Sequence, residues 1–574
     1  MTLLASDPER PSWSEIRNKI ARRTLPRKSD YAGLRTSWRA DLTAGLTVAI
    51  IALPLALGFG VSSGVGAAPG LVTAVIAGFV AAVFGGSSLQ VSGPTGAMAV
   101  VLLPIVARYG PESVAIVAIM AGGLIILAGL LGLGRMVSLI PWPVVEGFTL
   151  GIGVVILLQQ FPLALGTEKP DGDNVALLAV KTLAATDWVA AAPSLILTLG
   201  TCALIMGLNR WRKTLPASLI AVVLGTLVTL ALNLDVAKIG AIPTSLPAPS
   251  WPSVSMEQTS TLFTAAFAVA ALAALESLLS ARVADGMNDE TPRTSPNREL
   301  FGQGLANIAS GMFGAMPATG AIARTAVNVR AGGRTRMASV FHAVVLAGVV
   351  YLGAPLVSHI PLPTLAGVLI ITAARMVDWR TARTIIRASR ADTLVFFLTF
   401  GTTVVFDLVL AVEVGVAVAA VLALRALSRS SKLLRDPIKP SEDNIEAETE
   451  HQLLNEHIAV YRIEGALFFG DTRRFLDELT QVADVKVVIL RLGAIRVLDT
   501  SGAIALGEVV NDLRRRGVLV LLKGLQPYHR RVIENVGVLA ALGSPDHLFD
   551  QLPTAIDYAR AYIRGELDPA EPRG

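Results

Sequence analysis

Cysteine and charge are both scarce in this chain, and each shortage excludes a class of protein. The single cysteine, Cys202, excludes an internal disulfide and any metal cluster built from several cysteines. Charged residues make up only 16% of the chain and hydrophobic residues 53%, whereas soluble proteins carry about a quarter charged residues. The chain also lacks a nucleophile–base constellation, a phosphate-binding loop and a cluster of metal ligands. We therefore expect neither an enzyme nor a metal or organic cofactor.

Long uncharged runs recur between about residues 44 and 424, and many of them can cross ~30 Å of hydrocarbon. This pattern predicts a polytopic α-helical membrane protein whose environment is the lipid bilayer. The formal net charge of +5 fits such a protein, because Lys and Arg collect in cytoplasmic loops. A nucleic-acid partner is not expected. The first forty residues are polar and basic, so residues 1–40 are predicted to form a cytoplasmic N-terminal region.

Two stretches inside the apolar part nearly repeat each other. Thr95-Gly96-Ala97-Met98-Ala99 corresponds to Thr319-Gly320-Ala321-Ile322-Ala323, and each has a proline within two residues upstream. Apolar segments that are interrupted at matching places in two halves of a membrane protein indicate paired broken helices around a site near the bilayer midplane. The repeat therefore predicts where the functional site lies.

The apolar runs number about fourteen, which divides into seven plus seven. The first repeat covers about residues 41–233 and the second about 261–427, and together they form a transmembrane domain at 41–427. Residues 166–187 are expected to form a polar connection, and the arginines between residues 380 and 390 a charged loop. Because seven is odd, the two repeats must be inverted relative to each other.

Loop charges test this topology. With a cytoplasmic N-terminus, the loops predicted to lie inside carry most of the basic residues, namely Arg210, Arg212, Lys213, Arg330, Arg334, Arg336, Arg380, Arg383, Arg387 and Arg390. The predicted external loops after spans 5 and 7 carry only Lys169, Lys181 and Lys238, and Arg108 is an exception. The positive-inside rule therefore supports the predicted orientation.

The character of the chain changes after residue 427. A basic juxtamembrane segment with Arg425, Arg429, Lys432 and Arg435 is followed by an acidic stretch from Ser441 to Glu450. Residues 428–450 are predicted to be a linker to a soluble α/β domain at 451–565, with a tail at 566–574. Residues 458–463, 485–490 and 517–522 are strand-like, and Thr472–Leu479 is predicted to be helical. Strands that alternate with helices indicate βα units on one sheet. An even number of spans places this domain in the cytoplasm.

Several motifs, in order, resemble the SulP anion transporters, the sulfate permease group related to solute carrier family 26. They begin at Asp41 (DLTAGLTVA), Val91 (VSGPTG), Leu275 (LESLLSAR) and Pro317 (PATGAIAR), and Leu498 to Gly502 (LDTSG) resembles the loop of a STAS domain. The resemblance covers nearly the whole chain. It implies a core domain that moves against a gate domain, a homodimer in the plasma membrane, and a small inorganic or carboxylate anion as substrate. It also makes Ser501 a candidate regulatory phosphosite.

The broken helices provide chemistry that suits an anion. Helix N-termini offer free N–H groups and a positive dipole end. Thr95 and Thr319 add hydroxyl donors, and Gly96 and Gly320, with Ala97 and Ala321 beside them, let the backbone approach the ligand. Small residues also serve tight helix packing, but the near-repeat at matching positions favours the binding interpretation.

Two ionisable residues lie well inside predicted spans. Arg324 falls in the first turn after the second interruption, where a charge costs ~3 kcal/mol unless it meets a partner or a wet cavity. We expect it to attract the anion, the alternative being a structural salt bridge. Glu276 could take up a coupling proton or sodium ion, pair with Arg324, or be structural. Phe59 is expected to wall the site, and His342 is interpreted as peripheral.

The sequence thus predicts a secondary active anion transporter that works by elevator-type alternating access, coupled to protons or sodium. Sulfate is the first candidate substrate, with bicarbonate and C4-dicarboxylates as alternatives. One rival is a proton-coupled nucleobase carrier on the same fold, which should lack the C-terminal domain and should not need Arg324. Another is a membrane-anchored signalling protein whose STAS domain is the active part and in which Ser501 would be the sensitive position.

Overall fold

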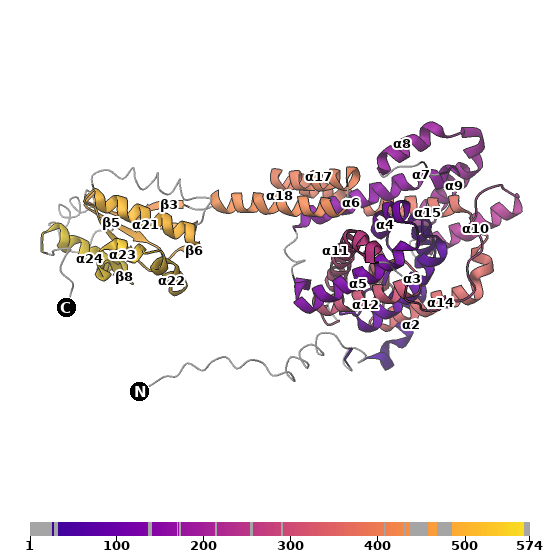
Figure 1. Ribbon diagram of the computed structural model, residues 1–574, viewed down its shortest axis with the longest axis horizontal. Helices are drawn as coiled ribbons and strands as arrows, with labels where there is room; N and C mark the ends of the chain where they lie inside the picture. The colour runs from indigo at the N-terminus through magenta and orange to yellow at the C-terminus, as the bar shows by residue number, and fades with distance from the viewer. Residues whose placement is uncertain are drawn as a thin grey trace. The chain divides into compact units, whose positions relative to one another are not determined.

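The computed structural model describes residues 26–27, 33–135, 141–168, 170, 174–212, 215–252, 256–288, 291–406, 408–429, 432–436, 457–467 and 485–566. The chain forms two compact units, Met1–Ala417 and Val418–Gly574. The first is helical and the second is built on a β-sheet (Figure 1).

The first half of the helical unit contains the elements α2 to α10. Their bounds are α2 Leu34–Ser62, α3 Ala67–Phe84, β1 Ser92–Gly93, α4 Gly96–Tyr109, α5 Ser113–Leu131, α6 Trp142–Gln159, α7 Phe161–Leu165, α8 Val175–Ala185, α9 Trp188–Trp211 and α10 Ala217–Ala231. Where α2 and α3 cross, Gly60 and Gly70 allow the backbones to touch. A Cβ on Gly60 would lie 3.1 Å from the Cα of Gly70, so only small residues permit this crossing.

The second half contains the elements α11 to α18. Their bounds are α11 Met256–Met287, α12 Pro296–Met312, β2 Thr319–Gly320, α13 Ile322–Arg330, α14 Met337–Val357, α15 Leu362–Met376, α16 Trp379–Ala388, α17 Arg390–Val405 and α18 Leu408–Arg429. As in the first half, a short strand and a short helix replace one full helix.

The helix contacts repeat between the two halves. The contact of α2 with α14 has its counterpart in the contact of α11 with α5. The contact of α12 with α5 corresponds to that of α3 with α14. The contact of α17 with α6 corresponds to that of α9 with α15. Each comparison follows one rule. If every predicted span is replaced by the span seven places away in the chain, the first pair of helices becomes the second pair. The pairs α3–α12, β1–β2 and α6–α15 map onto themselves. This is the contact pattern of two inverted seven-span repeats, as the sequence predicted.

The same contacts sort the helices into two groups. A core group consists of α2–α5 and α11–α14, and a gate group of α6–α10 and α15–α17. The groups meet where α15 and α10 pack on α2 and where α6 packs on α4. At the first of these contacts, the side chain of Leu369 lies 3.0 Å from the position of a Cβ on Gly58, so an apolar side chain packs directly on a glycine there.

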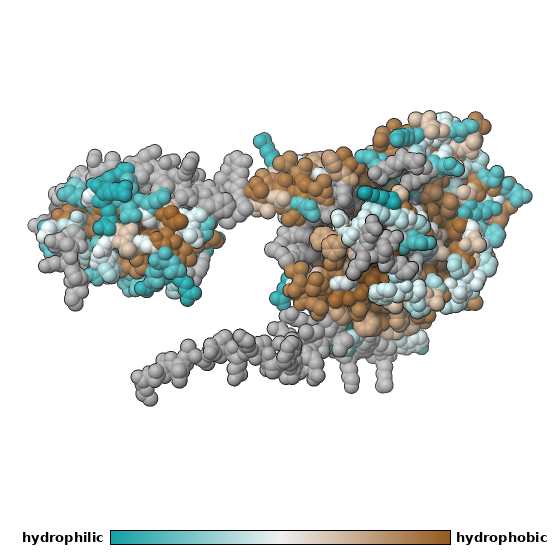
Figure 2. Space-filling model, in the orientation of Figure 1, coloured by the Kyte–Doolittle hydropathy of each residue, from teal (hydrophilic) through white to brown (hydrophobic). Residues whose placement is uncertain are grey.

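The outside of the helical unit is apolar, as a lipid-facing surface requires. Large hydrophobic side chains are exposed there, among them Ile196 at 70% and Leu352 at 85% (Figure 2). Eight of the described helices are long and apolar enough to cross a membrane. Others, such as α4 and α10, are apolar but shorter. Helices α4 and α13 are short because each begins at the interruption and continues in one direction only.

Three details of the prediction were wrong. Residues 166–187 are not simply a polar connection, because Asn174 caps the helix α8 within them. The arginines between 380 and 390 lie largely on α16, an amphipathic helix capped by Asp378, and not in a loop. Helix α2 begins at Leu34, seven residues before the expected start at Asp41. The last two errors follow from charged or polar helical turns beside an apolar run, and the first from a short apolar helix between polar residues.

The C-terminal unit is a small α/β domain. Its sheet runs in the order β3-β4-β5-β7-β8, with β6 also pairing with β4. The strands are β3 Lys432–Asp436, β4 Ile458–Leu467, β5 Val487–Arg491, β6 Ile495–Leu498, β7 Leu519–Lys523 and β8 Leu548–Phe549. The pairing of β3 with β4 is antiparallel and the others are parallel.

Helices cover both faces of this sheet, because alternate strand residues face opposite ways. Val488 and Leu490 pack with α21 (Thr500–Arg515), α22 (Pro527–Asn535) and α23 (Val538–Leu542). Val487 and Ile489 pack on the other face with α24 (Leu552–Ile563). The three predicted strands are confirmed, whereas Thr472–Leu479 lies outside the described residues.

Candidate functional site

A two-residue antiparallel bridge brings the two interrupted stretches together. Ser92 pairs with Gly320 and Gly93 pairs with Thr319, and the N–H of Ala321 donates to the carbonyl of Val91 at 2.9 Å. Stretches more than two hundred residues apart therefore meet inside the helical unit, as the near-repeat predicted. Bridge residues Ser92, Thr319 and Gly320 are all buried.

Each half of the bridge continues directly into a short helix. Thr95 is the N-cap of α4, and its hydroxyl accepts from the N–H of Met98 at 3.3 Å. Ala321 is the N-cap of α13 and provides no side-chain cap. The first N–H groups of both helices therefore lie beside the bridge, where most of them lack an intrahelical partner. Their positive dipole ends favour an anion at this point.

Glu276 on α11 links the two halves of the site. Its Oε2 accepts from the hydroxyl of Thr95 at 2.8 Å and from the hydroxyl of Thr319 at 2.9 Å. One carboxylate oxygen thus binds both threonines of the near-repeat. The sequence named all three residues but did not predict that they would bind one another.

Arg324 lies on the first turn of α13 and is 2% exposed. Its Nη2 donates to the carbonyl of Pro94, while Nη1 is buried without a hydrogen-bond partner. Nη1 lies 2.6 Å from the position of a Cβ on Gly93, so only glycine at that position leaves it room. Arg324 and Glu276 both bind other groups, and no ion pair joins them in the described part of the chain. A direct ion pair with Arg324, one of the alternatives considered for Glu276, is therefore absent here, and a donor of Arg324 stays available.

Buried amides on α12 hold the second interrupted stretch in its extended form. Gln303 donates from Nε2 to the carbonyl of Ala318 at 2.8 Å and accepts from the hydroxyl of Ser92 at 2.9 Å. Asn307 binds both the N–H and the carbonyl of Ala318, each at 2.9 Å. Residue Ser310 donates to the carbonyl of Met316 at 2.7 Å. The sequence analysis missed these residues, although their spacing places them on one face of a helix within a span.

Buried carboxylates fix the outer ends of both stretches. Glu299 accepts from the N–H groups of Gly86 at 2.8 Å and Ser87 at 3.0 Å, just before β1. Asp41 accepts from the N–H groups of Arg334 at 2.8 Å and Thr335 at 2.9 Å, just after α13. These bonds anchor the broken helices to α12 and α2.

Phe59, predicted to wall the site, lies against the start of α4, together with a residue that the sequence did not indicate. A Cβ on Gly96 would overlap the end of the Ile156 side chain and would lie 3.1 Å from the ring of Phe59. Phe59 on α2 and Ile156 on α6 therefore close over the start of α4. Ala97 is buried in the adjacent apolar cluster, so only its backbone can serve the site.

Two further buried side chains lie near the bridge. A Cβ on Gly320 would overlap the amide of Gln90, and neither polar atom of that amide has a hydrogen-bond partner. His342 is fully buried on α14, beside Gly45 and Gly78, and both ring nitrogens lack a partner. The interpretation of His342 as peripheral was therefore wrong. An isolated histidine gives no sign in the sequence of which helix face is buried.

Ser501 is remote from this site in the chain and lies in the first turn of α21. The side chain of Asp499 caps this helix by accepting from the N–H of Gly502 at 2.7 Å. Ser501 is half-buried. Within the described ranges, no group of three or more His, Cys, Asp and Glu side chains could hold a metal ion.

Comparison with known proteins places the chain in a family. Residues 38–399 match the model of the sulfate permease family and residues 451–555 match that of the STAS domain. The chain is 34% identical over 523 residues to the putative sulfate transporter YvdB of Bacillus subtilis, covering 89% of this chain and 96% of that protein. It is 32% identical over 517 residues to the bicarbonate transporter BicA of Picosynechococcus, covering 87% and 90%.

Solved structures agree with these relatives. The transmembrane domain of a cyanobacterial BicA is 33% identical and superposes with a TM-score of 0.58, covering 67% of this chain and 97% of that one. Murine solute carrier 26 family member A9, in its inward-facing state, gives a TM-score of 0.78 at 17% identity, covering 98% and 96%, which supports the fold alone. The chain is therefore a multi-pass membrane protein of the sulfate permease (SulP) family of anion transporters, with a C-terminal STAS domain.

Proposed function

We propose that this protein is a secondary active transporter that binds a small anion between the N-termini of α4 and α13. The observation that carries the proposal is the free, buried Nη1 of Arg324 beside the bridge. A buried guanidinium with an unused donor is costly, and an anion would both neutralise the charge and accept the hydrogen bond. The free N–H groups of the two helices and the unpartnered amide of Gln90 would complete a set of donors.

Glu276 gives this site a means of coupling anion transport to the movement of a proton or sodium ion. While its carboxylate accepts from Thr95 and Thr319, those hydroxyls cannot donate to an anion. A proton or sodium ion on Glu276 would weaken this competition and would cancel a negative charge near the substrate. The hydroxyls could then turn to the anion. Coupling ion and anion would thus bind together, as symport requires.

Sulfate is the proposed substrate, with bicarbonate and C4-dicarboxylates as the alternatives. The names of the relatives support both inorganic anions. All of these ligands are oxyanions, and neutral N–H donors with a single guanidinium suit them without binding too tightly to release. Membership of an anion transporter family argues against the nucleobase carrier, and the complete donor set argues against a purely signalling role for the membrane unit.

Alternating access would follow from movement of the core group against the gate group. The groups meet through apolar contacts such as Leu369 on Gly58 and Ile156 on Gly96. Such surfaces can slide without breaking many hydrogen bonds. The anion site belongs to the core group, whose broken helices are anchored by Asp41 and Glu299. The site would therefore travel with the core, as in an elevator.

We propose that the transporter is a homodimer in the plasma membrane, with the N-terminal region 1–40 and the STAS domain 451–565 in the cytoplasm. The transmembrane domain is proposed to cover 41–427, with the tail at 566–574. The segment 428–450, predicted as a linker, includes β3 (Lys432–Asp436), which pairs with β4 and so belongs to the sheet of the C-terminal unit. The positive loops support the orientation. Ser501 is proposed as a regulatory phosphosite, because it lies half-buried at the first turn of α21, where added charge would alter the packing of the domain.

The test is uptake of labelled sulfate, bicarbonate and fumarate into proteoliposomes that contain the purified chain. Each anion is offered with no gradient, with an imposed proton gradient and with an imposed sodium gradient. We expect uptake of at least one anion, accelerated by one of the two gradients. Correctly folded protein that transports none of the three anions would contradict the proposal.

A further inference from the structure

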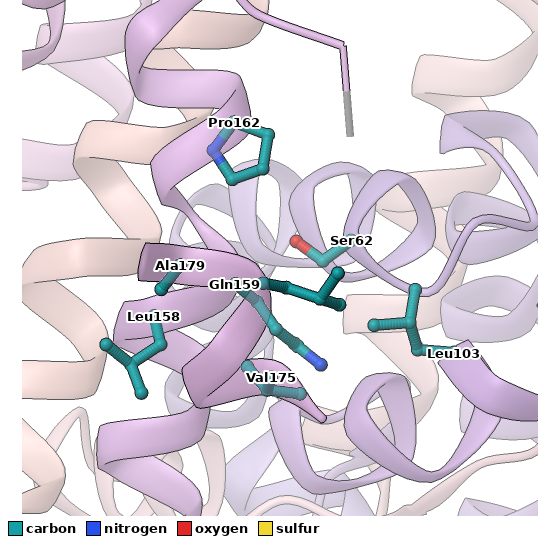
Figure 3. A pocket seen from close by; sticks show the side chains of 8 residues that line it. Ser62, Leu103, Leu158, Gln159, Pro162, Val175 and Ala179 are labelled. Carbon is teal, nitrogen blue, oxygen red and sulfur yellow. The ribbon is translucent and has the colours of Figure 1, made fainter. Parts of the chain in front are cut away.

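A small, mainly apolar pocket with two polar side chains in its wall lies between the core and gate groups. Its volume is about 30 Å³, and it is lined by Ser62, Leu103, Leu158, Gln159, Pro162, Val175, Leu178 and Ala179. These residues come from α2 and α4 of the core group and from α6, α7 and α8 of the gate group. Figure 3 shows the side chain of Gln159 reaching from its helix into the space near Ser62 and Leu103.

The pocket lies further along α2, α4 and α6, in the direction of the chain, than the candidate anion site. Phe59 and Ile156 close over Gly96 and form a layer. Ser62 lies three residues after Phe59, Gln159 lies three residues after Ile156, and Leu103 lies seven residues after Gly96. Residues at these spacings share one face of a helix, about one or two turns of 5.4 Å apart. The pocket is therefore separated from the anion site by the layer of Phe59 and Ile156.

The same spacings give the direction of the pocket from the site. In α2 and α6 the pocket residue follows the layer residue Phe59 or Ile156 in the chain, and in α4 it follows Gly96, which the layer covers. All three helices therefore run from the layer towards the pocket. In the orientation proposed above, these odd-numbered spans run outwards. The pocket therefore lies on the external side of the anion site.

One polar group of the pocket, the Gln159 amide, has a donor that is free for an anion. Both polar atoms of the Gln159 amide are buried and have no hydrogen-bond partner. Ser62 accepts from Nε2 of Gln160 at 3.2 Å, an arrangement that fixes its hydroxyl at the pocket wall. Gln160 is itself held by the carbonyl of Ile156 at 3.1 Å. An unpaired buried amide is unfavourable, and an acceptor such as an oxyanion would relieve that cost.

We propose that this pocket is an outer binding station for the transported oxyanion, with Gln159 as its specificity-determining donor and Phe59 and Ile156 as the barrier to the main site. The proposal rests on the transport function proposed above. Its donors are neutral, so it would bind weakly and let the anion keep part of its hydration shell. The fully desolvating contacts with Arg324 would follow only when the barrier opens.

The position between the two groups makes the station sensitive to the transport cycle. One wall belongs to α2 and α4 and the other to α6, α7 and α8. Movement of the core against the gate would change the distance between these walls. The station would therefore exist in full when the core is near its outer position, and it would be dismantled as the core moves inwards.

The single cysteine makes a direct test possible. In a Cys202→Ala background, Ser62→Cys is treated from outside with a charged, membrane-impermeant thiol reagent, with and without sulfate. We expect labelling that sulfate slows at least threefold. Ser245→Cys, an exposed residue before Trp251, is the matched control and should be labelled equally with and without sulfate. Labelling of Ser62→Cys that sulfate does not change, or no labelling from outside, would overturn the proposal.

Sided kinetics supply the second readout. Gln159→Leu removes the amide and keeps the size of the side chain, so the KM for anion offered from outside should rise about tenfold, the value of one hydrogen bond to a charged group. The KM for anion offered from inside should change less than twofold. Equal changes on both sides would indicate a structural role and would contradict the proposal. Leu177→Ala, on the exposed side of α8, should leave both values unchanged.

These readouts separate the two proposals. A parent protein that transports no anion removes the proposed function, whereas the labelling experiment needs no transport. A parent protein that transports sulfate, with unprotected Ser62→Cys and an unchanged external KM in Gln159→Leu, removes the outer station alone.

Discussion

The two broken helices resemble each other in sequence but differ in what they do. Helix α4 begins with a side-chain cap from Thr95, extends over 14 residues, and packs almost entirely among apolar side chains of α5, α6 and α11. Helix α13 has 9 residues and no side-chain cap. It carries Arg324, and its Thr325 bonds to Ser280 on α11 at 3.0 Å. The broken helix of the first half packs among apolar side chains, whereas that of the second half carries the charged residue Arg324.

The difference is sharpest at the fourth position after each glycine of the near-repeat. After Gly96 this position is Val100, which belongs to the apolar cluster around α4. After Gly320 it is Arg324, with its unpartnered Nη1. An inverted repeat does not need two charges, because in the proposed site a single guanidinium would serve both halves. We therefore expect affinity to depend on the second half and stability on the first.

The largest expected effect separates these two positions. Arg324→Ala should weaken anion binding by about 2–3 kcal/mol, a factor of roughly 30 to 150 in Kd, because a charge-assisted hydrogen bond is lost. Val100→Ala should lower thermal stability and leave Kd within twofold. Equilibrium binding of labelled sulfate measures both, and the size-exclusion profile shows whether each variant folds. Equal losses in the two variants would break the comparison, and unchanged binding in Arg324→Ala would remove the role of that residue.

Glu276 lies on α11 of the second half, outside both broken helices, and its replacement tests what joins the two helices. Glu276→Gln removes the charge that competes for the hydroxyls of Thr95 and Thr319. Uptake down an anion gradient should persist, while the acceleration by an imposed proton or sodium gradient should fall at least tenfold. The control is Glu413→Gln, on the exposed face of α18, which should keep the acceleration of the parent. A variant with intact gradient dependence would show that coupling resides elsewhere.

The location of the site could be predicted from the sequence because its residues violate the local pattern. Thr, Gly and Pro interrupt apolar runs, and Arg324 and Glu276 are charges where hydrocarbon should favour none. The fold followed from counting the spans and from the parity of their number. The strands at 458–463 and 485–490 were found because buried parallel strands form continuous apolar runs.

The sequence could not show at which residue each of the two broken helices begins. Alignment of the near-repeat pairs Thr95 with Thr319, but the N-caps are Thr95 and Ala321, and Thr319 lies in the bridge. The helix α13 therefore begins two residues later than the alignment implies. Which residue caps a helix depends on bonds to distant segments, here the bond from Ala321 to Val91. The amides of Gln303 and Asn307 were missed for the same reason, since their partners are backbone groups of another stretch.

The glycines of the near-repeat should also differ, by less than the charged residues. A Cβ on Gly320 would overlap the Gln90 amide and would approach the Cα of Ser277 to 3.0 Å. A Cβ on Gly96 meets the end of the flexible Ile156 side chain and the edge of the Phe59 ring. Because backbone moves less easily than a side chain, Gly320→Ala should cost about 2 kcal/mol of stability and Gly96→Ala about 1 kcal/mol. Thermal melts in detergent measure this order, and a reversed order would contradict the assigned packing.

The smallest expected effect concerns the two threonines. Both donate to Glu276, but only Thr95 also caps a helix. Thr95→Val should therefore lower stability by about 1 kcal/mol more than Thr319→Val, the value of an N-cap. Thr95→Ser restores a hydroxyl with cap geometry and should recover most of that loss, whereas Thr319→Ser should change little. Equal melting temperatures for the two valine variants would mean that the cap contributes nothing, and that the first half owes its stability to apolar packing around α4 alone.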